Sequence, residues 1–80
     1  MTLSIRSTSK IVLLGNAQSR DTVPARIWEG MTSTGIKVHC FIARVVVDKD
    51  EGRIEEFQRE LQECAPPSTE ISTYPLRLIL

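Results

Sequence analysis

The sequence predicts a small α+β domain, in which a small antiparallel β-sheet of three or four strands is packed on one face by a single α-helix. Two strand-like runs on either side of a glycine-containing turn predict a central hairpin at about 24–47. Apolar residues at helical spacing predict one helix at about 51–64. An alternating segment after the helix adds a last strand, so the expected order is β-β-β-α-β.

The first part of the chain contributes one short strand. Residues 1–9 are rich in Ser and Thr, with Leu3 and Ile5 alternating, and they form either an edge strand or a loose tail. Lys10–Leu14 is a compact apolar run that Gly15 ends, which is typical of a strand. A polar loop is expected at 16–23. Eighty residues make a single domain, 1–80, with a modest core, so self-association is a route to more buried area.

The central hairpin is the best supported element. Ala25–Thr32 and Ile36–Val47 are the two strand candidates, and the second is rich in Val and Ile, which suit a pleated surface. Gly35, between them, supplies the positive φ angle that a tight hairpin turn needs.

The predicted helix has a start signal, an apolar stripe and a stop signal. Asp48 and Asp50 are good N-cap residues. The stripe consists of Ile54, Phe57, Leu61 and Cys64. We expect it to pack on the sheet, and we expect Pro66-Pro67 to end the helix because proline cannot continue it.

The last ten residues predict an edge strand. Their apolar side chains alternate along an extended segment, with Tyr74, Leu76, Leu78 and Leu80 on one face. Pro75 has no N–H group, so the strand lies at an edge of the sheet or pairs only in its second half.

Charge and composition narrow the partner classes. Ten basic and ten acidic residues give zero net charge, and no basic cluster favours nucleic acid. No run approaches the roughly 18 apolar residues of a membrane span. A secretory signal is not evident, so we expect a cytoplasmic protein whose Cys40 and Cys64 are reduced thiols. The two cysteines and one histidine lack metal-ligand spacing, and no cofactor is expected.

No catalytic constellation is evident either. His39 and Cys40 are neighbours on a strand and point to opposite faces. Cys64 lies on the apolar helical stripe and is expected in the core. The acidic residues of the helix alternate with arginines, which is typical of a solvated face with ion pairs. We therefore expect a protein without enzymatic activity.

The candidate interaction surface depends on the parity of the hairpin loop, which the sequence leaves open. With two or four loop residues, one face carries a candidate protein-binding set: Arg26, Trp28, His39 and Phe41. With the three-residue loop Ser33–Gly35, Trp28 instead shares a face with Val38, Cys40 and Ile42 and is ordinary core. A shift of the strand pairing by one residue would move every side chain of a strand to the opposite face of the sheet.

Two functional hypotheses follow. The first is a small protein-interaction or regulatory module that binds another protein or itself, as a homodimer or larger assembly, through a sheet face or an exposed strand edge. The second is a small-molecule-binding or enzymatic subunit whose site forms between protomers. In that case Arg26, Arg44 and His39 would contact an anionic ligand.

Overall fold

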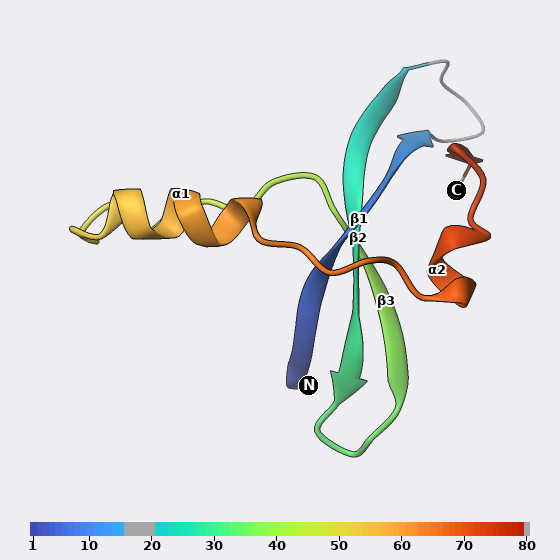
Figure 1. The fold of residues 1–80 in the computed structure, drawn as a ribbon, viewed down its shortest axis with the longest axis horizontal. Coiled ribbons are helices and arrows are strands. Elements are labelled where there is room, and N and C mark those ends of the chain that lie inside the picture. Colours follow the sequence, from blue (N-terminus) through green and yellow to red (C-terminus); the bar gives the residue numbers. More distant parts are fainter. Residues whose placement is uncertain (16–20, 80) are drawn as a thin grey trace.

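The computed structural model describes residues 1–15 and 21–79 and confirms the small α+β fold. Its elements are β1 (Leu3–Gly15), β2 (Thr22–Thr32), β3 (Lys37–Ile42), α1 (Ile54–Gln62), α2 (Thr69–Ser72) and β4 (Arg77–Ile79). The four strands form one sheet in the order β3-β2-β1-β4 (Figure 1). β2 is antiparallel to both neighbours, whereas β4 runs parallel to β1, so the sheet is mixed rather than purely antiparallel. The predicted loop at 16–23 lies outside the described residues for positions 16–20.

β1 joins the two N-terminal segments into one strand of 13 residues. Its pairing with β2 shifts between Ser7 and Ile11, where three residues of β1 oppose one residue of β2. Thr8 in this bulge is fully buried, and its hydroxyl donates to the carbonyl oxygen of Ile27 at 2.7 Å. On the outer side, Ala65 forms a parallel bridge to Thr8, with N–H···O distances of 2.9 and 3.0 Å. The irregular Ser/Thr stretch is thus held by partners distant in sequence.

The loop of the β2–β3 hairpin contains an odd number of residues. Trp28 lies opposite Cys40, and the Thr32 N–H donates to the Ile36 carbonyl oxygen at 2.9 Å beyond the end of β3. Three residues, Ser33–Gly35, therefore form the loop inside this last pair, with Gly35 at φ 90°. Opposed residues share a face, so Trp28 lies with Val38, Cys40 and Ile42. β3 ends at Ile42, although the β-branched run continues to Val47. In the same register Ala43 would lie opposite Ala25, and Arg44 would lie opposite Pro24, which has no N–H group.

The core lies on the opposite face of the sheet, here called the Ile27 face. Val12, Ala25 and Ile27 are buried there under Ile71 of α2, and Leu14, Phe41 and Tyr74 pack around them. The sequence predicts an extended segment over the last ten residues, 71–80. This prediction is wrong at its start, because residues 71 and 72 belong to the helix α2. Ser68 follows Pro66-Pro67 and caps this short helix, since its Oγ accepts from the N–H of Ile71 at 3.3 Å. The predicted edge strand is confirmed only as the short β4, after Pro75.

α1 does not pack on the sheet, and that prediction is wrong. Figure 1 shows α1 extending away from the strands on the side opposite α2. None of its residues is buried, and Ile54 and Leu61 are 50% and 43% exposed. Cys64, expected in the core, is exposed beyond the end of α1. The apolar stripe identified which side of the helix favours burial, but α2 occupies the position over the core.

Candidate functional site

The Trp28 face of the sheet is apolar and only partly covered. Its apolar residues are Leu3, Ile5, Ile11, Leu13, Pro24, Trp28, Val38, Cys40 and Ile42. None of them is buried, and Leu3 and Ile11 are 39% and 44% exposed. Soluble monomers rarely leave a large contiguous apolar surface open to water unless it binds something. This face is therefore the main candidate site.

A shallow groove of about 430 Å³ lies on this face. Its lining consists of Ile11, Pro24, Arg26, Trp28, Ile42, residues 43–46 and Leu61. Two arginines, Arg26 and Arg44, give the groove positive charge. Arg26 Nη1 donates to the carbonyl oxygen of Thr8 at 2.8 Å, which holds the guanidinium beside the bulge and leaves its other N–H groups available. The groove thus combines an indole, aliphatic side chains and guanidinium groups, which are common at protein interfaces.

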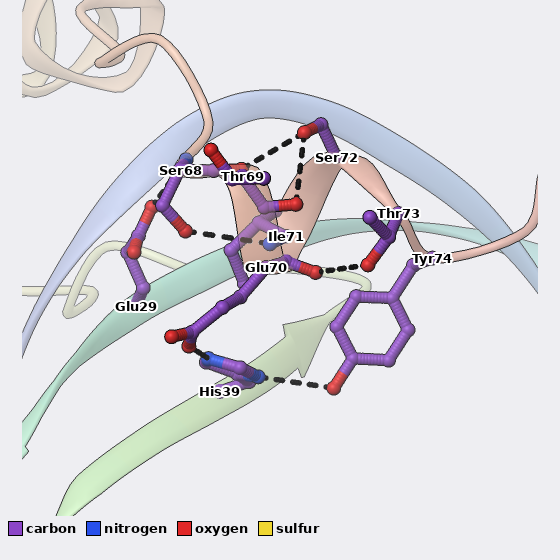
Figure 2. Close-up of polar contacts among 9 residues, drawn as sticks. All are labelled: Glu29, His39, Ser68, Thr69, Glu70, Ile71, Ser72, Thr73 and Tyr74. Carbon is purple, nitrogen blue, oxygen red and sulfur yellow. Dashed lines mark hydrogen bonds and ion pairs between the residues drawn. The ribbon is translucent and has the colours of Figure 1, made fainter.

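A cluster of polar side chains lies on the Ile27 face and holds α2 (Figure 2). His39 Nδ1 and the Tyr74 hydroxyl are 3.0 Å apart and share a hydrogen bond. His39 Nε2 lies 3.7 Å from Glu70 Oε2. From β2, a Glu29 carboxylate oxygen accepts from the backbone N–H of Ser68 at 3.1 Å. We call these five residues the α2 lock.

Aromatic packing supports the same interpretation of the α2 lock. The Tyr74 ring meets Phe41 edge-on at 5.3 Å between centroids, and it meets His39 edge-on at 5.7 Å. Such pairs contribute about 0.5–1.5 kcal/mol beyond the area they bury. A carboxylate, an imidazole and a phenol in series can pass protons in principle, yet these contacts are accounted for by the attachment of α2 to β2 and β3.

The structure separates the four predicted binding residues. Arg26 and Trp28 lie on the Trp28 face, whereas His39 and Phe41 lie on the Ile27 face. The single face proposed for an even loop is therefore wrong, because the loop has three residues. The face expected for the odd loop is confirmed, but Trp28 is only partly buried there and does not belong to the core. That these residues bind a protein stays a prediction.

A charged pair fixes the turn before α1. Arg53 Nε and Nη2 donate to the two carboxylate oxygens of Glu51 at 2.8 and 3.3 Å, and the Arg53 backbone N–H donates to Oε1 at 3.0 Å. These hydrogen bonds lower the pKa of Glu51 below its ordinary value of 4.5. The same side-chain bond raises the pKa of Arg53. Both groups face solvent, so we expect the pair to set the direction of the turn more than the stability of the fold.

Sequence reasoning missed two functional features. It did not place Tyr74 and Glu70 beside His39, or Ser68 beside Glu29, although Pro66-Pro67 followed by Ser68-Thr69-Glu70 is a helix-start signal. It also did not foresee that the stripe of α1 would stay uncovered, and no local signal carries that information.

Metal, membrane and family comparisons add little. Across residues 1–15 and 21–79, no group of three or more His, Cys, Asp or Glu side chains is placed to hold a metal ion. Among the same residues, no helix has the length and apolar character to cross a membrane. The chain matches no family model, no curated protein and no solved structure.

Proposed function

We propose that this chain is a small, non-enzymatic protein-interaction module that acts through its Trp28 face. One observation carries the proposal: nine apolar residues lie on this face and none of them is buried, although the opposite face of the same sheet forms a core. Burying apolar surface contributes about 25 cal/mol per Å², so a partner that covers this face would gain substantial free energy.

The residue types on the face support the same function. Trp and Arg are over-represented among residues that dominate binding energy, and Trp28 lines one groove with Arg26 and Arg44. β3 adds a second opportunity, since it is the outermost strand on its side of the described sheet. Zero net charge means that no strong overall repulsion opposes association.

The alternative function, a small-molecule site between protomers, has weaker support. It would use Arg26, Arg44 and His39 together, but His39 lies on the Ile27 face and contacts Tyr74 and Glu70. We expect the module to act in the cytoplasm, where the two free thiols, Cys40 and Cys64, would stay reduced.

Site-specific photo-crosslinking in cells of the organism whose genome encodes this chain tests the proposal. A benzophenone amino acid at Ile11 reports on the Trp28 face, and the same group at Val23 is a matched control. The two positions are β-branched, lie on neighbouring strands and are 44% and 53% exposed, but Val23 is on the Ile27 face. We expect a protein adduct several-fold more abundant from Ile11. Equal yields from both positions would contradict the proposal.

A further inference from the structure

The segment from Ala43 to Glu63, here called the arm, leaves the sheet and returns. It consists of the extended run Arg44–Val47, a turn and α1. Within the part of the chain that the structure describes, the four residues of this run make no backbone hydrogen bond, and Val46 is 83% exposed. In the stripe of α1, Ile54 is 50% exposed, and Leu61 is 43% exposed although it lines the groove beside Trp28. The arm, which projects from the strands in Figure 1, therefore presents apolar side chains and open backbone groups to water.

The charge of the chain divides between the arm and the remainder. The arm carries seven acidic and four basic residues, a net charge of −3. The remaining residues carry six basic and three acidic ones, a net charge of +3. The arm and the remaining residues are thus opposite in net charge, with Arg26 as the basic residue that the latter contribute to the groove, and each part has exposed apolar side chains.

The exposed area fits a second copy. The chain exposes 6375 Å², whereas a compact monomer of 9.0 kDa exposes about 4,900 Å². Its radius of gyration is 14.2 Å, against about 12 Å for a compact domain of 80 residues. The excess of about 1,500 Å² exceeds the roughly 800 Å² that each partner buries in a standard interface. A dimer could therefore form from surface that a compact fold would have buried.

From these observations we infer that the partner of the Trp28 face is the arm of a second copy of this chain. Two copies associate about a two-fold axis, and α1 of each copy lies across the Trp28 face of the other. The inference rests on the proposed function and names its partner. A self-complementary dimer is favoured because one chain carries both halves of the contact, an acidic helix with an apolar stripe and an apolar face that carries Arg26.

A complementation experiment tests whether two copies exchange their arms, so that the arm of each copy covers the Trp28 face of the other. The face variant is Trp28→Asp, or Trp28→Thr if circular dichroism shows that the first does not fold. The arm variant is Ile54→Asp with Leu61→Asp, two exposed positions whose substitution leaves the core intact. Arg59→Gln, on the polar side of α1, is the control, and its charge change equals that of one Ile54→Asp substitution. Sedimentation velocity gives the mass of each sample.

We expect the wild type and Arg59→Gln to sediment as dimers of twice 9.0 kDa. Each variant alone should be monomeric, with association weakened more than a hundred-fold. An equal mixture should regain a heterodimer, because one intact arm then meets one intact face. The face variant has no Trp, so emission from the mixture reports only on Trp28 of the arm variant. That emission should shift to shorter wavelength as the face variant is added.

Other results would overturn the exchange and leave the proposed function to be judged separately. A dimeric arm variant would mean that the interface does not use α1. A mixture that stays monomeric, or a monomeric wild type with strongly blue-shifted emission, would mean that the arm closes on its own sheet or does not dock. If Ile11 then crosslinks to a different protein, the interaction function stands without self-association. If Ile11 gives no adduct, both proposals fail.

Discussion

The two faces of one sheet are covered very differently, although both are rich in apolar residues. On the Ile27 face, a helix of four residues covers the core and is attached through Ser68, Glu70 and Tyr74. On the Trp28 face, an amphipathic helix of nine residues is present in the chain but stands away from the sheet. A short helix with specific polar contacts is thus placed more firmly than a longer one with only an apolar stripe. Amphipathicity shows that a helix needs a partner, and contacts distant in sequence decide which one.

The largest expected loss of stability comes from a substitution in the core on the Ile27 face. Ile71→Ala removes a fully buried side chain from α2 and should cost about 2–5 kcal/mol, much of the stability of so small a domain. Ile11→Ala, on the Trp28 face, should cost less than about 1 kcal/mol in the isolated chain. Urea denaturation at low protein concentration measures both. Similar losses for the two variants would mean that the Trp28 face is already packed in the monomer.

A glycine substitution tests how closely the strands approach beneath the Trp28 face. A Cβ at Gly30 would overlap the backbone carbonyl of Ser4 on β1, so β1 would have to move. Gly30→Ala should therefore destabilise the fold by about 1–3 kcal/mol. Gly52→Ala is the control, because nothing lies near a Cβ there. Thermal unfolding of the two variants compares them, and a neutral Gly30→Ala would contradict the close approach.

A smaller effect is expected from the α2 lock. Tyr74→Phe keeps the ring packing but removes the hydrogen bond to His39, and should cost about 0.5–1.5 kcal/mol. Amide hydrogen exchange at Ile71 should become faster while exchange in α1 stays unchanged. A double-mutant cycle with His39→Ala isolates the bond. Strict additivity of the two substitutions would show that it contributes nothing.

The smallest effect concerns the turn before α1. The folded chain lowers the pKa of Glu51, so this group stabilises the fold above its ordinary value of 4.5 and loses that contribution as the pH falls through the lowered pKa. Carboxyl chemical shifts in an NMR titration should give a midpoint below 4.5. Arg53→Gln should move the midpoint toward the ordinary value but not fully to it, because the backbone N–H groups of residues 52 and 53 still act on Glu51, and an unchanged midpoint would rule out the pair.

The sequence predicted the elements that depend on local chemistry. Gly35 marked the hairpin turn, and the predicted helix at about 51–64 contains α1, although the residue before α1 is Arg53 and neither Asp48 nor Asp50 caps it. It did not settle the parity of the loop, because both parities suit the residues between the strands. It also did not predict which helix covers the sheet. That outcome depends on Glu29 meeting Ser68 across 39 positions, a contact without a local pattern.

The valines at 45–47 have one further consequence. A β-branched run with free backbone groups is the type of segment that seeds aggregation when chains are concentrated, for instance during expression. Arg44 and Asp48 flank the run, one charge of each sign. Charged residues in such positions act as gatekeepers, because adding further strands would force them together or out of water. Replacing them with apolar residues should make the chain precipitate before it loses its fold.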